Sequence, residues 1–105
     1  MGASFVRLTE TAEADLAEIW SYLATEATES AADEFISGLE ARLELLAAFP
    51  LSGSARFQLA EGLRVMIYGM YAVYYLSRDK GILLIRVLHG ARDIEAIADQ
   101  GGFAV

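Results

Sequence analysis

Apolar side chains in the first half of the chain recur with the period of an α-helix. A short apolar segment at residues 5–8 predicts an opening strand. Beyond it, apolar side chains follow the spacing i, i+3, i+4, i+7, which places them on one helix face. They are Leu16, Ile19, Trp20 and Leu23. Thr9 or Thr11 can supply the N-cap oxygen, so a helix is expected from one of these threonines to the polar stretch 25–30.

A second apolar stripe predicts another helix, which begins at Thr28 or Ser30 and ends before Pro50, whose ring cannot continue a helix. The stripe consists of Phe35, Ile36, Leu39, Leu43 and Leu46. Gly38 costs such a helix about 1 kcal/mol relative to alanine, and a close approach of the first helix would explain why a side chain is missing there. Two helices with a short polar joint are expected to form an antiparallel hairpin.

The apolar period changes to two after Gly62. Leu63, Val65 and Ile67 alternate with polar or larger residues, which predicts a half-buried strand over residues 63–68. Two further segments are apolar on both faces and predict central strands. They are residues 71–76 and 82–88, joined by the hairpin loop 78–81.

A last short helix is expected over residues 94–98, because Asp93 is placed to cap it. The tail, about residues 99–105, is expected to be mobile unless Phe103 docks. The predicted order is therefore β-α-α-β-β-β-α in one domain spanning residues 1–105. This is an α+β fold in which a helical hairpin covers one face of a small antiparallel sheet and the opening strand joins the sheet edge.

Charge is distributed unevenly along the chain, whose net charge is −7 at pH 7. Residues 1–48 carry ten acidic and two basic side chains, whereas residues 49–105 carry five and six. Lysine occurs once, so the chain lacks the basic stripe that phosphate binding needs, and direct DNA binding is not expected. One histidine and no cysteine argue against a structural zinc site or disulfides, and no metal or cofactor is expected. Without an apolar run of about 18 residues or a signal-peptide core, a cytoplasmic protein with no membrane contact is expected.

The hydrophobic fraction is high for so short a chain. It reaches 55% in 105 residues. A small domain has too little interior to bury every large apolar side chain. An exposed apolar patch is therefore expected, and such patches commonly mark protein interfaces.

Candidate chemistry gathers at the end of the last predicted strand. It consists of Arg86, His89 and Arg92. Each residue also has an ordinary structural interpretation. The histidine can bond nearby backbone across the turn. The strand arginine can pair with Glu61 or Asp93, or face solvent beside Arg64. Arg92 can pair with its neighbour Asp93.

Several segments, in chain order, resemble the ParE branch of the RelE/ParE toxin superfamily. They are ADLAEIW (14–20), AADEF (31–35), LAAFP (46–50) with Gly53, GLR (62–64), Tyr71 with Tyr75, and RVLHGARD (86–93). The resemblance spans about residues 6–97 and implies a RelE/ParE-like fold. It also implies the toxin of a type II toxin–antitoxin system that inhibits DNA gyrase, is neutralised by a ParD-like antitoxin, and is not an enzyme.

The resemblance also suggests which residues meet each partner. The target is expected to contact Arg64, Arg86, His89 and Arg92. The antitoxin is expected to bind beside the hairpin and the sheet edge, at Leu16, Trp20, Leu23, Phe57, Leu59 and Tyr75. The helical spacing of Trp20 with its apolar neighbours also fits a core position.

Two other functions are compatible with the superfamily. RelE-like members are ribosome-dependent endoribonucleases that cut messenger RNA. In that case Arg64, Arg86 and Arg92 would stabilise charge and His89 would shuttle protons. That pattern relies on lysines and a C-terminal tyrosine, whereas this chain has one lysine, Lys80, and no tyrosine near residue 97. The third interpretation is a detoxified member that acts only in complex assembly and autoregulation.

Overall fold

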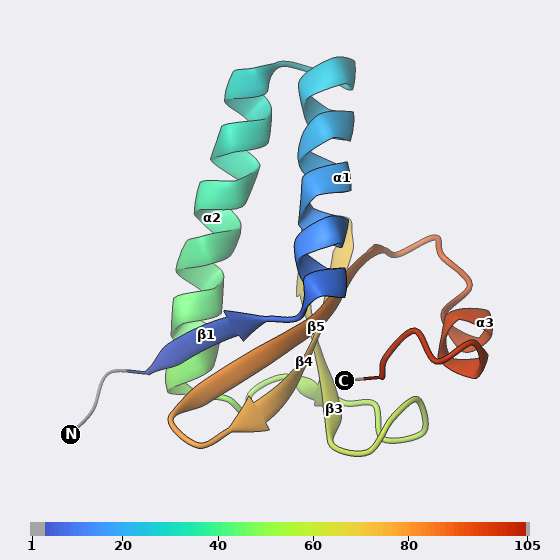
Figure 1. The fold of residues 1–105 in the computed structure, drawn as a ribbon. Coiled ribbons are helices and arrows are strands. Elements are labelled where there is room, and N and C mark those ends of the chain that lie inside the picture. The colour runs from blue at the N-terminus through green and yellow to red at the C-terminus, as the bar shows by residue number, and fades with distance from the viewer. Residues whose placement is uncertain (1–3, 105) are drawn as a thin grey trace.

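The fold is an α+β arrangement in which a helical hairpin stands on a five-stranded sheet (Figure 1). A computed structural model describes residues 4–104. Its elements are β1 (Phe5–Leu8), α1 (Glu10–Glu26), α2 (Glu29–Ala48), β2 (Ser54–Ala55), β3 (Leu63–Tyr68), β4 (Tyr71–Arg78), β5 (Gly81–His89) and α3 (Ile94–Asp99). The predicted order is confirmed, with β2 as an addition inside a segment expected to be a loop. None of the described helices is long and apolar enough to cross a membrane.

The sheet has the strand order β1-β5-β4-β3-β2. β3, β4 and β5 form the expected antiparallel meander. β1 occupies the expected edge, where it runs parallel to β5 with Phe5 opposite Gly81. The sheet is therefore mixed. A Cβ on Gly81 would collide with the backbone of Phe5, so glycine is what allows β1 to lie this close.

Threonine side chains fix the starts of both long helices. The Thr9 hydroxyl accepts a hydrogen bond from the Ala12 N–H (3.0 Å), and the Thr28 hydroxyl accepts one from the Ala31 N–H (2.9 Å). Each bond satisfies an N–H that the first helical turn leaves without a partner. Of the predicted alternatives, Thr9 and Thr28 are the caps, whereas Thr11 and Ser30 lie inside the helices.

Gly38 makes room for a strand rather than for the neighbouring helix. A Cβ on Gly38 would overlap the hydroxyl of Tyr68, which belongs to β3. The prediction that α1 explains this glycine is therefore wrong. As predicted, the missing side chain lets another group approach the helix backbone. That group lies on the sheet and not on α1.

The main core lies between the hairpin and one face of the sheet. Its buried side chains come from α1, α2, β4 and β5, and include Ile19, Leu39, Leu43, Leu46, Val73, Tyr75, Ile82, Leu84 and Val87. Leu16 and Leu23 are half-buried and pack against this core from α1. The helical stripes therefore face the sheet, apart from Trp20 and Ile36, which belong to neither core.

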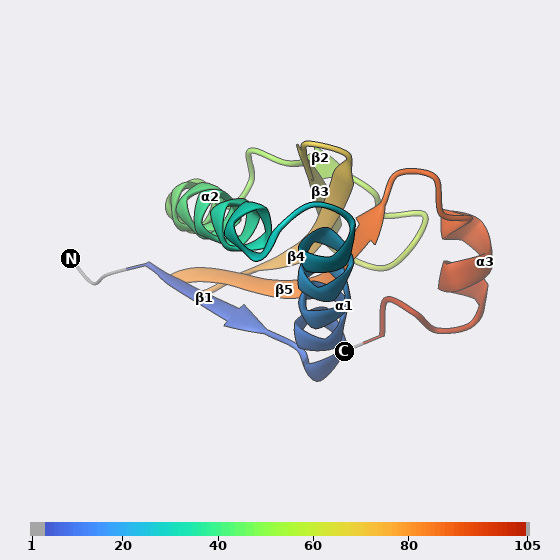
Figure 2. The ribbon, with the colours of Figure 1, turned by 90° about the horizontal axis from the view of Figure 1, so that it is seen from above.

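A second core covers the opposite face of the sheet, where α3 lies apart from the hairpin (Figure 2). Its members include Leu63, Val65, Tyr74, Ile85, Leu88 and Phe103. Phe103 is only 4% exposed, and its ring centroid lies 4.7 Å from that of Tyr74. The tail was expected to be mobile unless Phe103 docks, and Phe103 does dock. Val105 lies outside the described residues.

β3 is buried on both faces rather than one. Leu63 and Val65 face the second core, as the alternating pattern predicts, but Met66 and Tyr68 pack against the main core from the other face. Ile67 is 61% exposed. The prediction that Ile67 belongs to the buried face is therefore wrong, because the second core does not extend to this end of β3.

Candidate functional site

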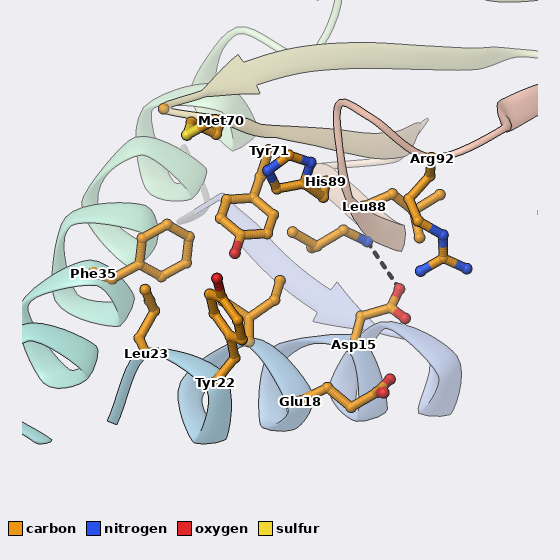
Figure 3. A pocket seen from close by; sticks show the side chains of 13 residues that line it. Asp15, Glu18, Tyr22, Leu23, Phe35, Met70, Tyr71, Leu88, His89 and Arg92 are labelled. Atoms are coloured by element: carbon orange, nitrogen blue, oxygen red, sulfur yellow. Dashed lines mark hydrogen bonds between the residues drawn. The ribbon is translucent and has the colours of Figure 1, made fainter. Parts of the chain in front are cut away.

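A groove of about 650 Å³ opens between α1 and the end of the sheet where β4 begins and β5 finishes (Figure 3). Its lining side chains come from α1, α2, the turn between β3 and β4, the start of β4, the end of β5 and the segment that follows β5. They include Asp15, Glu18, Tyr22, Leu23, Phe35, Met70, Tyr71, His89 and Arg92. Three of these are predicted site residues, and the others were not singled out as contact residues from the sequence.

Aromatic rings form one wall of this groove. The ring of Tyr71 stands edge-on to that of Phe35, at 5.2 Å, and to that of His89, at 5.5 Å. The Tyr22 side chain points toward Tyr71 from α1 and is 60% exposed (Figure 3). Burial raises the pKa of Tyr71 above its ordinary value, and the nearby Tyr22 raises it further.

His89 closes the turn that follows β5. The N–H of Ala91 donates to Nδ1 of His89, at 3.1 Å. This confirms the structural interpretation of His89 as a strand-end histidine bonded to nearby backbone. The residue also lines the groove. Within residues 4–104 no group of three or more histidine, aspartate or glutamate side chains is placed to hold a metal ion.

Arg86 is held by a buried carboxylate on α1. Its Nε and NH2 atoms donate to the two oxygens of Asp15, at 2.7 and 3.0 Å, and the N–H of Val87 donates to the same carboxylate at 3.0 Å. The side chains of Arg86 and Asp15 are 14% and 8% exposed. Hydrogen bonding to Asp15 raises the pKa of Arg86, although its burial acts in the opposite direction.

This pairing removes Arg86 from the candidate target surface. The expected partners, Glu61 and Asp93, are not involved, and the alternative of a solvent-facing arginine beside Arg64 is also wrong. A guanidinium that is bonded at three nitrogens and largely buried cannot reach another protein without breaking the fold. Its remaining NH1 donates to the Gly102 carbonyl, at 3.1 Å.

A β-bulge explains where Arg86 points. Tyr74 lies opposite Arg86 and Tyr75 lies opposite Leu84, so Ile85 is an extra residue on β5. A bulge breaks the strict alternation of a strand and re-aims the side chains beyond it. Here the re-aimed side chain is Arg86, which reaches both α1 and the C-terminal tail.

Arg92 is the cation that this groove presents. It is exposed, and it forms no ion pair within the described residues 4–104. The expected local pair with Asp93 is wrong, because Asp93 instead caps α3 by accepting from the Ala96 N–H at 3.1 Å. In Figure 3 the Arg92 guanidinium points toward the α1 side of the groove, where Asp15 and Glu18 lie.

Arg64 lies in a different hollow, of about 480 Å³, which also includes Phe57. Its NH1 donates to the Gly53 carbonyl at 2.9 Å, and its guanidinium carbon lies 5.6 Å from the centroid of the Phe57 ring. In the sheet, Arg64 of β3 lies opposite Tyr75 of β4, whereas His89 of β5 lies opposite Tyr71 of β4. Four residues of β4 separate those positions by about 13 Å along the strand, so the two predicted target residues do not line the same hollow.

Tyr75 is a core residue and not a surface contact. Its relative exposure is 0%. Its hydroxyl donates to the Pro50 carbonyl at 2.8 Å and accepts from the Gly53 N–H at 2.9 Å. This corrects the expectation that Tyr75 contacts an antitoxin, because the ring has no surface to offer and its polar group is occupied by the loop after α2.

Replacing Tyr75 by phenylalanine is expected to lower the free energy of unfolding by about 1–3 kcal/mol, since two backbone groups lose a partner. Urea unfolding followed by circular dichroism measures this loss. Tyr22→Phe is the matched control, because Tyr22 is exposed and has no hydrogen bond among the described residues. Equal stability of the two variants would show that the loop after α2 does not depend on Tyr75.

The other residues expected to meet an antitoxin are spread over the surface. Leu16 lines an apolar groove of about 330 Å³ between β1 and α2, and Leu23 lines the groove of Figure 3. Trp20 is half-buried, and its Nε1 donates to Asp33 across the hairpin at 2.9 Å. Leu59 is half-buried against the second core, and Phe57 lies in the hollow with Arg64.

Comparison with known proteins identifies relatives over nearly the whole chain. The family model described as "ParE toxin of type II toxin-antitoxin system, parDE" matches residues 6–94. Toxin ParE1 of Caulobacter vibrioides is 31% identical over 90 residues, which cover 86% of this chain and 93% of that protein. A solved structure titled "Chromosomal ParDE TA system from P. aeruginosa" matches with a TM-score of 0.68 at 17% identity, covering 83% of this chain and 96% of the other. This last match supports the fold expected from the sequence.

Proposed function

The chain belongs to the ParE toxin family of type II toxin–antitoxin systems, and on that premise we propose that it acts by binding and inhibiting DNA gyrase. The observation that carries the proposal is the family match over residues 6–94, which includes β1 from its second residue and all elements from α1 to β5. We further propose that a ParD-like antitoxin, encoded beside the toxin, neutralises it.

The arrangement of the cationic residues supports a binding protein over a ribonuclease. Cleavage of RNA needs charge-stabilising groups and a proton shuttle around one phosphate. Arg86 is bonded to Asp15 inside the protein, and Arg64 and His89 lie at different positions along the sheet. Only His89 and Arg92 of the four candidates line the same groove. This is a poor set for in-line cleavage.

The antitoxin is proposed to bind along the open edge of β1 and the apolar groove beside it. Among the described residues 4–104, β1 pairs with β5 on one side only, so its other edge can accept an added strand. The groove between β1 and α2 contains Val6, Leu8 and Leu16. An amphipathic segment that covers this edge would also remove an exposed template for unwanted pairing.

Pulse labelling after induction of the toxin alone tests its target. Inhibition of gyrase is expected to lower incorporation of labelled thymidine early, while incorporation of labelled methionine continues. Purified toxin should then inhibit supercoiling by gyrase in vitro, and the protein encoded beside it should restore supercoiling. An early fall in methionine incorporation instead would point to the ribosome and contradict the gyrase proposal.

A chain that arrests neither process, and allows normal growth when induced alone, would favour the detoxified interpretation.

An engineered variant helps separate a gyrase-binding toxin from a ribonuclease. His89→Gln keeps an acceptor near the Ala91 N–H but cannot act as a titrating proton shuttle. A ribonuclease that depends on His89 for proton transfer should lose its cuts in translated messages on this change, whereas a toxin that only binds gyrase should make no such cuts before or after it.

A further inference from the structure

A second exposed surface, away from the groove of Figure 3, combines apolar side chains with arginines. Leu51 and Phe57 are 66% and 54% exposed, and they line the hollow together with Arg64 and Arg78. Leu45 and Phe49, at the end of α2 just before this hollow, are also exposed. We call the four hollow residues Leu51, Phe57, Arg64 and Arg78 the loop surface. Exposed apolar side chains gathered in this way commonly mark a protein interface.

The backbone under the loop surface is held firmly. From inside, the buried Tyr75 hydroxyl bonds Pro50 and Gly53. From outside, Arg64 donates to the carbonyls of Gly53 and Leu51, at 2.9 and 3.4 Å. A Cβ on Gly53 would also collide with Tyr75. The loop therefore presents Leu51 in one arrangement before any partner arrives, and preorganisation of this kind reduces the entropic cost of binding.

The charge of this region is opposite to that of the rest of the chain. Residues 49–80 carry four basic and two acidic side chains, whereas the whole chain has a net charge of −7. Within residues 4–104 neither Arg64 nor Arg78 forms an ion pair. Glu61 also lines the hollow, so the hollow itself has one net positive charge. An acidic partner can therefore approach here, whereas the glutamate-rich hairpin repels it.

From these observations we infer that this toxin binds its target through the loop surface. The matching surface on the target is a protein surface that is apolar and acidic. A nucleic acid is a weaker fit, because the hollow exposes two large apolar side chains, Leu51 and Phe57, and carries only one net positive charge for phosphate binding. The inference rests on the proposed toxin function, and it assigns Phe57 to the target rather than to the antitoxin.

Variants that place a negative charge at an exposed residue test the inference with little risk to the fold. In Leu51→Glu and Arg78→Glu the new carboxylate repels an acidic partner. Each is expected to raise the toxin concentration for half-inhibition of gyrase supercoiling at least tenfold. Ile67→Glu is the matched control for Leu51, because Ile67 is equally exposed but lies outside the hollow. Lys80→Glu makes the same charge change two residues from Arg78 and also lies outside the hollow.

The controls and the binding partner separate the possible outcomes. Both variants should melt within a few degrees of the wild type and still copurify with the protein encoded beside the toxin. Full activity of both variants would overturn the inference, as would loss of copurification, which would make this an antitoxin surface. If the toxin binds a DNA duplex alone and Arg78→Glu abolishes that binding, the partner of this surface is nucleic acid and not protein.

Failure of the gyrase proposal is distinguishable from failure of this inference. If the wild type arrests growth but leaves gyrase untouched, the same four variants are compared by growth arrest. Relief of arrest by Leu51→Glu and Arg78→Glu alone would then support the loop surface for another target. Arrest by all four variants would overturn it, and a wild type without any toxicity would overturn both proposals.

Discussion

Replacing Asp15 by alanine is expected to lower the free energy of unfolding by about 3–5 kcal/mol. The change leaves the Arg86 guanidinium largely buried without its counter-charge, and it also removes the acceptor of the Val87 N–H. Removing one partner of a buried pair is costly because the remaining charge is neither solvated nor compensated. Urea unfolding of the purified toxin, followed by circular dichroism, measures the loss.

Two further variants separate the buried pair from the helix that carries it. Glu18→Ala removes an exposed carboxylate from the same helix, one that forms no ion pair within residues 4–104 and acts on Arg86 less than Asp15 does, and should change stability by less than about 0.5 kcal/mol. Replacing both members, Asp15→Leu with Arg86→Met, should recover much of the lost stability, because no unpaired charge remains. A loss below about 1 kcal/mol in Asp15→Ala would mean that Arg86 finds water or another partner.

The elements of this fold were predictable because their signals are local. The threonine cap of α1, which the sequence narrows to Thr9 or Thr11, the apolar stripe of α1 and the break at Pro50 each lie within a few residues of the structure they determine. The turns between β3, β4 and β5 are short. Consecutive strands therefore pair with each other and form an antiparallel meander. The edge position of β1 agreed as well, although its parallel direction was not anticipated.

The contacts that fix Arg86 were not predictable, because they join distant parts of the chain. Asp15 and Arg86 are separated by 71 positions, and Asp15 appeared in the sequence as one of many acids on an exposed-looking helix. The bulge at Ile85 was also invisible, since a strand that is apolar on both faces gives no alternation for an extra residue to interrupt. Without the bulge, Arg86 looks like a candidate for solvent.

The candidate site was predictable only in part, for the same reason. His89 and Arg92 share a groove because both follow the end of one strand. Arg64 belongs elsewhere because the register of β3 against β4 sets its position, and one sequence without pairing information does not fix a register. Tyr22 and Met70 line the groove through spatial proximity alone. Both side chains are highly exposed, and only the structure shows this.

Replacing Phe103 by alanine is expected to lower the free energy of unfolding by about 3 kcal/mol, the lower end of the range for a buried phenylalanine. Phe103 is 4% exposed and packs on Tyr74, on the sheet face that the hairpin does not cover. α3 has six residues, too few for a helix that is stable without tertiary packing. Its half-buried residues Ile94 and Ile97 pack against the same second core as Phe103.

Hydrogen exchange measured by mass spectrometry shows whether this effect is local. Undocking of Phe103 would release the Gly102 carbonyl from Arg86 and the Gly102 N–H from the Ile97 carbonyl. Amides of α3 and β4 should then exchange faster in Phe103→Ala, whereas those of α2 should not. Phe49→Ala is the matched control, because Phe49 is 62% exposed and its loss should leave exchange unchanged. Unchanged exchange in Phe103→Ala would show that α3 stays docked without the phenylalanine, so that Ile94 and Ile97 alone hold the second core closed.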